Sequence, residues 1–178
     1  MRPAQRFIAM AAIATLALSG CGRREPPPPP VPRPAPPVVT APEAPAPSAA
    51  DYMAAESSRS LLVVRASELA MTRSANGRVR AIAEQLRRDH VGIAAQLNMA
   101  GRRLNLLPSA SLLPLDQMQF DGLSRASDFD GAYLRTMKSA VEKCSKGHAS
   151  FAANGSSPTL RPVAQFGAST CRDELRSL

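Results

Sequence analysis

The chain has 178 residues and carries 22 Lys and Arg against 14 Asp and Glu, which gives a formal net charge of +8. Aromatic residues make up only 4% and Trp is absent. This composition argues against the stacking platforms that bind single-stranded nucleic acid, so we expect no nucleic-acid partner. Residues 50–178 hold 17 of the basic and 12 of the acidic residues. This mild excess favours an ordinary solvated surface, and the alternative is contact with an anionic envelope polymer or with lipid headgroups.

The first twenty residues have the pattern of a signal peptide. Two arginines precede an apolar run, residues 7–18, which is too short to span a bilayer as a helix and is typical of a signal-peptide core. The run ends in Leu18-Ser19-Gly20-Cys21, which resembles the lipobox of bacterial lipoproteins. We therefore expect residues 1–20 to be removed and Cys21 to carry acyl chains, which together anchor a protein stably. The alternative is a plain secretory signal with a chance cysteine.

The segment from residue 21 to residue 49 predicts a spacer. Twelve of the 17 prolines fall between Pro26 and Pro47, and proline disrupts helix and sheet interiors because it lacks an amide donor. We expect a disordered, extended tether; the alternative is a ligand for a proline-recognising partner. Gly22 follows the cysteine, and lipoproteins without aspartate there usually reach the outer membrane. The predicted location is thus the bacterial cell envelope, with the outer membrane favoured and the domain facing the periplasm.

Residues 50–178 are predicted to form one all-α domain, because apolar residues recur at helical spacing and no alternating strand pattern is present. The first two helices are expected at about 50–74 and 76–104, and a short helix at 115–123. The next begins behind Ser127 or Asp128 as N-cap and ends at Asn154-Gly155, and the last has Pro158 in its first turn. One apolar stripe per long helix and mostly short loops predict an antiparallel four-helix bundle, with the short extra helix in the long connection.

Two cysteines, Cys144 and Cys171, lie on the apolar stripes of the last two helices. In an antiparallel hairpin, residues equidistant from the loop face each other, and the midpoint of this pair falls between Ser157 and Pro158, in the predicted loop. An oxidising compartment favours a disulfide between them. Two buried free thiols are an alternative. A thiolate metal site is another, since Cys144 and His148 have the i, i+4 spacing of two ligands on one helix face, with Cys171 and His90 to complete it.

Two stretches, NGRVRAIAEQLRRDHVGIAAQL and SDFDGAYLRTM, resemble the bacterial domain-of-unknown-function family numbered 4142 over residues 51–178. The resemblance implies an exported, ferritin-like four-helix protein. His90 falls on the Asp-His position of the family's second helix. Phe129, Asp130 and Tyr133 fall on its Phe-Asp-x-x-Tyr motif.

The chain also departs from the family's pattern. Val63 stands where the first helix usually has glutamate, and Val141 stands where the third helix has histidine. Near the C-terminus, where the family tends to end in proline, leucine and histidine, the chain has Ser169, Cys171 and Glu174. A ferritin-like metal site needs carboxylates and histidines from facing helices. Because Val63 and Val141 offer no lone pair, His90 is predicted to be a buried neutral imidazole bonded to a carbonyl, a hydroxyl or a carboxylate.

The sequence contains no Gly-rich phosphate loop, no CxxC pair and no Gly-x-Ser-x-Gly elbow, so we expect no enzymatic activity. The favoured function is non-enzymatic binding or scaffolding in the cell envelope, with a membrane contact through the Cys21 lipid, no cofactor, and an envelope protein or anionic polymer as partner. The alternative is a ferritin-like protein that binds zinc, iron or copper through His90, Cys144, His148 and Cys171.

Overall fold

The computed structural model describes residues 46–108 and 110–178, and these form five helices and no strand. The elements in chain order are α1 (Ala49–Arg73), α2 (Gly77–Leu104), α3 (Pro114–Ser124), α4 (Phe129–Asn154) and α5 (Arg161–Glu174). The predicted all-α class and the order of four long helices and one short helix are confirmed. The predicted signal peptide, Cys21 and most of the predicted tether lie outside the described residues.

Side-chain caps fix where three of the helices begin. Ser48 accepts the amide of Asp51 at the start of α1, Asn76 accepts the amide of Arg78 at the start of α2, and Asp128 accepts the amide of Gly131 at the start of α4. Each cap satisfies an amide that has no partner within its helix. At the other end of α2, Asn105 takes the left-handed conformation with φ 55°, one that asparagine tolerates better than most residues.

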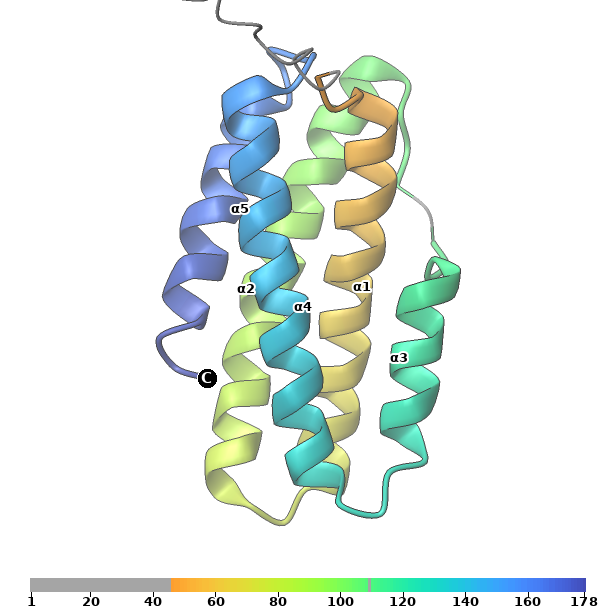
Figure 1. Ribbon diagram of the computed structural model, residues 1–178, viewed down its shortest axis with the longest axis vertical. Helices are drawn as coiled ribbons and strands as arrows, with labels where there is room; N and C mark the ends of the chain where they lie inside the picture. Colours follow the sequence, from red (N-terminus) through yellow and green to blue (C-terminus); the bar gives the residue numbers. More distant parts are fainter. Residues whose placement is uncertain (1–45, 109) are drawn as a thin grey trace, which may run out of the picture. The chain divides into compact units, whose positions relative to one another are not determined.

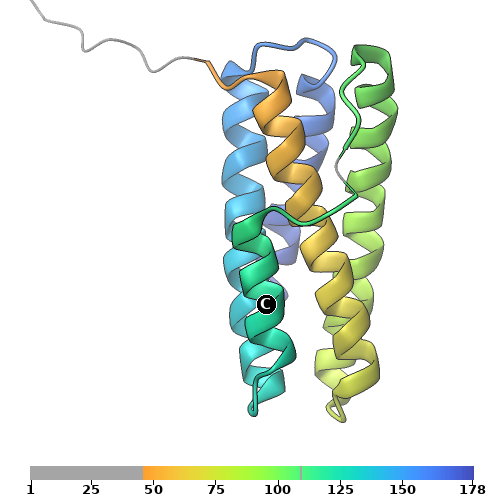
Figure 2. The ribbon, with the colours of Figure 1, turned by 90° about the vertical axis from the view of Figure 1, so that its right-hand side faces the viewer.

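The four long helices pack side by side, and neighbouring helices are antiparallel (Figure 1). The chain folds as two hairpins, α1 with α2 and α4 with α5, and these make the most extensive helix–helix contacts. The α1 helix also packs against α4, and α2 packs against α5. A long crossover connects the two hairpins, and its helix α3 lies along α1 and α4 (Figures 1 and 2).

Ser58 and Asp116 hold the crossover against the bundle. The hydroxyl of the α1 residue Ser58 donates to Oδ2 of Asp116 in α3, and the same hydroxyl accepts the amide of Leu113 at 2.8 Å. Both side chains are buried, so this pairing fixes the start of α3 on the outer side of α1.

The predicted apolar stripes form the core. The α4 stripe is buried over its whole length, and so are the α2 positions Val79, Leu86, Ile93 and Leu97. The start of the last helix differs from the prediction: Pro158 lies in a turn, and α5 begins at Arg161 with Pro162 in its first turn. The amides of Leu160 and Arg161 bond back to the carbonyl of Ser157, which closes that turn before the helix starts. None of the described helices has the length and the apolarity that a membrane crossing requires.

Candidate functional site

Both histidines are fully buried in the centre of the bundle, His90 on α2 and His148 on α4. Two carboxylates and two cysteines gather around them from α1, α4 and α5. No member of this group exposes more than 3% of its surface, so none is hydrated by bulk water. We call this group the core cluster: Glu56, His90, Cys144, His148, Cys171 and Glu174.

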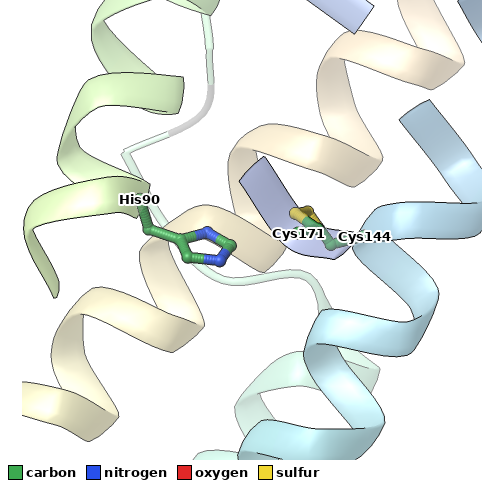
Figure 3. Close-up of side chains that lie close together, drawn as sticks. All are labelled: His90, Cys144 and Cys171. Atoms are coloured by element: carbon green, nitrogen blue, oxygen red, sulfur yellow. A yellow bond between two sulfur atoms is a disulfide. The ribbon is translucent and has the colours of Figure 1, made fainter. Parts of the chain in front are cut away.

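A disulfide joins Cys144 of α4 to Cys171 of α5, which is the pairing predicted from the antiparallel register. The two Cα atoms lie 6.1 Å apart. One ring nitrogen of His90 and the two sulfur atoms all lie within 4.8 Å of one another, and the imidazole points from α2 toward the disulfide (Figure 3). The same limit holds among ligand atoms of Glu56, Cys144 and His148. The core cluster therefore has two halves, one with His90 and one with His148, and Cys144 lies close to both histidines.

In one half, His148 lies between Tyr52 and Glu56 of α1. Its Nδ1 and the Tyr52 hydroxyl share a hydrogen bond of 2.8 Å, and its Nε2 faces Oε2 of Glu56 at 3.6 Å. Burial lowers the pKa of His148 to about 3, and the charges of His90 and Arg59 act in the same direction. The ring is therefore neutral at neutral pH. When Nδ1–H donates to Tyr52, Nε2 presents its lone pair toward Glu56.

Arg59 holds the carboxylate of Glu56 in place. Its guanidinium donates to Oε1 of Glu56 one helical turn away, and Oε2 is left facing His148. Burial raises the pKa of Glu56, while Arg59 lowers it and is the largest opposing influence. Burial also raises the pKa of Tyr52, so Tyr52 stays a neutral phenol and acts toward His148 as a hydrogen-bonding group rather than as a charge.

In the other half, His90 lies between Ser60 of α1 and Glu174 of α5. Its Nδ1 is 3.4 Å from the Ser60 hydroxyl, and its Nε2 is 3.3 Å from Oε2 of Glu174. The sequence predicted a buried imidazole bonded to a hydroxyl or a carboxylate, and the structure supplies both partners. Each histidine thus faces one carboxylate.

Several polar atoms in this region have no hydrogen-bond partner within the described part of the chain, although buried polar atoms are almost always paired. Three of the five belong to the core cluster and one to Arg59 beside it. A bound cation would satisfy the acceptor atoms among them, and ordered water would satisfy any of the five. The five atoms are Glu56 Oε2, Ser57 Oγ, Arg59 Nε, His148 Nε2 and Glu174 Oε1.

Two glycines make room for the core cluster. A Cβ atom at Gly167 of α5 would lie 2.5 Å from Nε2 of His148 and 2.6 Å from two ring carbons. A Cβ atom at Gly147 of α4 would overlap the carboxylate of Glu56. Glycine inside a helix costs roughly 0.5–1 kcal/mol relative to alanine, so the close approach of these side chains requires a residue that weakens its own helix.

A surface groove between α1 and α2 approaches the half of the core cluster that contains His90. It encloses about 260 Å³. Ser60 lines the groove and also bonds to His90, and the unpaired hydroxyl of Ser57 belongs to the same wall. One side chain therefore separates this groove from the His90 ring. The groove is lined by Ser57, Ser60, Leu61, Val64, Val91, Ala94, Asn98, Pro108 and Ala110.

The Phe-Asp-x-x-Tyr motif does not join the core cluster. The guanidinium of Arg73 lies over the Phe129 ring, 4.7 Å from the ring centre. Arg73 also donates to the backbone carbonyl of Ser124. Tyr133 bonds to the Ser67 hydroxyl at 3.0 Å. These contacts join the end of α1 to the turn between α3 and α4. Asp130 is half-buried in the first turn of α4, where a carboxylate suits the helix dipole.

Two members of the core cluster were missed by sequence reasoning, Glu56 and Glu174. The residues expected beside His90 were Val63 and Val141, and both of these valines are buried in the apolar core. Glu56 lies two turns before Val63, and His148 lies two turns after Val141. Because α1 and α4 are antiparallel neighbours, both shifts run toward the same end of the bundle. The signal was present in the spacing: Tyr52, Glu56 and Val63 follow one helix face.

The fold and the site thus define an all-helical bundle with ionisable side chains of four helices gathered in its core. The sequence model of the family described as Domain of unknown function (DUF4142) matches residues 34–177. The chain belongs to this family. No curated protein and no solved structure matches the chain.

Proposed function

We propose that this protein binds a transition metal ion in the core of its bundle. The observation that carries the proposal is the presence of two buried histidine–carboxylate pairs from four helices, with buried atoms of Glu56, His148 and Glu174 that have no hydrogen-bond partner among the described residues. In ferritin-like bundles, metal sites are built from carboxylates and histidines that project inward from facing helices. The sequence resemblance to such bundles supports the same function.

In each histidine–carboxylate pair, the distance from the ring nitrogen to the carboxylate oxygen suits a cation bound between them. Imidazole nitrogen and carboxylate oxygen bind zinc at about 2.0–2.2 Å, which places two such ligand atoms about 3.4 Å apart in a tetrahedral site. Nε2 of His90 lies 3.3 Å from Glu174, and Nε2 of His148 lies 3.6 Å from Glu56. The second separation is too long for a hydrogen bond. Zinc, iron and copper all accept this combination of ligands.

The remaining residues have positioning roles. Tyr52 orients His148 through Nδ1, as the outer partners of metal-binding histidines usually do. Arg59 fixes one oxygen of Glu56 and leaves the other free. A bound cation would supply positive charge beside two buried carboxylates, and we propose no reaction for it.

The proposed cellular setting comes from the sequence. The lipobox-like segment ending at Cys21 supports a lipid-anchored protein, and the proline-rich residues that follow support a tether. Together they favour a bundle that faces the periplasm from the outer membrane. An envelope location would expose the bundle to the metal ions of the periplasm rather than to those of the cytosol.

Elemental analysis of the mature full-length chain, purified natively and without chelators, tests the proposal. We expect a stoichiometric transition metal in the wild-type protein. Glu174→Gln and His90→Ala should lower the metal content, and the control Glu84→Gln should not, because Glu84 is exposed and pairs with Arg88 on the surface of α2. A chain that carries no transition metal and takes up none of zinc, iron or copper on titration would refute the proposal.

The second candidate is the non-enzymatic binding or scaffolding role expected from the sequence. It is favoured by the exposed apolar side chains of Val91 and Met99, 45% and 56% exposed, on α2 beside the α1–α2 groove. Crosslinking in intact cells through a photoreactive residue at position 99 tests it. A defined envelope protein captured there, from a chain that holds no metal, supports this role.

A further inference from the structure

The cysteines occupy the junction between the two histidine–carboxylate pairs. Sγ of Cys144 lies within 4.8 Å of a ligand atom of each histidine and of Glu56, and Cys171 lies within that distance of His90. Both cysteines are buried at no more than 1% exposure. An ion bound beside His90 therefore lies close to both sulfur atoms, and one bound between Glu56 and His148 lies close to that of Cys144.

The chemical state of the sulfur atoms decides what they can bind. A thiolate carries a negative charge and is a strong ligand for soft metals, whereas a sulfur atom in a disulfide is neutral and binds metals weakly. We propose that the reduced core cluster is a thiolate site for a thiophilic cation, zinc or copper(I), held by Cys144, Cys171 and His90. This inference rests on the proposed function and deepens it, because it names the class of metal and the condition for binding.

His148 is the candidate for a fourth ligand. It lies one turn after Cys144 on α4, and its Nε2 is unpaired and faces Oε2 of Glu56 at 3.6 Å. Tyr52 fixes the ring through the other nitrogen. Two thiolates and two neutral imidazoles around Zn²⁺ form a set with no net charge, which suits a water-free core better than a charged set does.

The switch between the two states is a thiol–disulfide exchange. When local opening of the bundle exposes the Cys144–Cys171 bond, an external dithiol attacks it and forms its own disulfide, so two electrons pass to the protein and two thiols are left. Binding of the cation then releases the two thiol protons. In the reverse direction, an external disulfide takes up the two electrons, the Cys144–Cys171 bond forms again, and the cation loses both thiolates.

Cobalt(II) is a suitable probe, because thiolate coordination gives it charge-transfer absorption that nitrogen and oxygen ligands do not give. The full mature chain is titrated with cobalt chloride in the oxidised state and after reduction with a phosphine, with zinc chloride added last as competitor. Thiols are counted in both samples, and circular dichroism verifies the helices. The comparison variant is Cys144→Ser with Cys171→Ser. Like the reduced protein it has no disulfide, and it differs from the reduced protein in having two hydroxyl groups in place of the two thiols.

We expect charge-transfer absorption in the reduced wild type alone, and its loss on addition of zinc. Affinity should be roughly a hundredfold or more above that of the oxidised chain and of the serine variant, because a structural zinc site draws on all of its ligands. Equal binding in both redox states without charge-transfer absorption overturns this inference and leaves the proposed function standing. No binding in either state overturns both. If the serine variant is unfolded, the oxidised wild type serves as the folded protein without thiolates, and the same comparison decides.

Discussion

Replacing Gly167 by alanine should destabilise the protein, although alanine is the better helix former. A Cβ atom there lies 2.5–2.6 Å from three atoms of the His148 ring. The ring is held on its other side by Tyr52 at 2.8 Å and is fully buried, so it has little room to yield. Alanine gains about 1 kcal/mol of helix propensity, whereas overpacking of a closed core costs typically 1–3 kcal/mol. We expect a net loss of about 1 kcal/mol.

Gly92 provides a matched control. It also lies inside a long helix, α2, but nothing lies within 4 Å of a Cβ atom placed there. Gly92→Ala should therefore stabilise the protein by about 0.5–1 kcal/mol. Denaturant unfolding of both variants, with the disulfide intact, measures the two changes as shifts in midpoint at constant slope. A Gly167→Ala protein as stable as Gly92→Ala would refute the packing of His148 against Gly167.

Four further outcomes are expected. Replacing both Cys144 and Cys171 by alanine should lower the free energy of unfolding by about 3–4 kcal/mol, because the bond closes a loop with a sequence separation of 27; an unchanged denaturation midpoint would contradict this. Tyr133→Phe should cost about 1 kcal/mol, since it leaves the buried Ser67 hydroxyl without its partner, and thermal unfolding measures it. Burial raises the pKa of Tyr133 to about 12, above its ordinary value of about 10, so its contribution to stability is complete below pH 10 and is lost as the pH rises from 10 toward 12. Denaturant unfolding at stepped alkaline pH should show a steeper loss in the wild type than in Tyr133→Phe, which keeps only the loss due to other groups such as Tyr52, whose pKa burial also raises. Cys21→Ser should leave the chain unlipidated and either unanchored or uncleaved, and recovery of a mature, membrane-bound form would contradict the lipobox interpretation.

Much of the fold was predictable because helix periodicity and capping are local properties. The starts of α2 and α4 follow from Asn76 and Asp128, whose side chains accept amides within three residues along the chain. The disulfide followed from a slightly longer argument, since two consecutive antiparallel helices fix which residues face each other. The start of α5 was wrongly placed at Pro158 because proline suits the first turn of any helix, and the chain offered a second proline at Pro162.

The candidate site was harder to predict, because it depends on which helices face each other across the bundle. Glu56 and Glu174 are separated by 118 positions in the sequence, and nothing local marks either one as buried. Charged residues are mostly exposed, so a glutamate on a helix is read as a surface residue by default. The apparent isolation of His90 followed from comparing it with Val63 and Val141, which lie two turns away from Glu56 and His148.

The sequence by itself determined the helical class, the order of the helices, their apolar stripes, the start of α4 behind Asp128, and that the two cysteines face each other. These features depend on residues a few positions apart or on the register of one hairpin. The tertiary structure alone decided that α1 and α5 each bring a carboxylate to a histidine, and that glycines at Gly147 and Gly167 leave space for them. The physical reason is that burial and pairing of charges depend on contacts between distant segments, which the linear order of residues does not record.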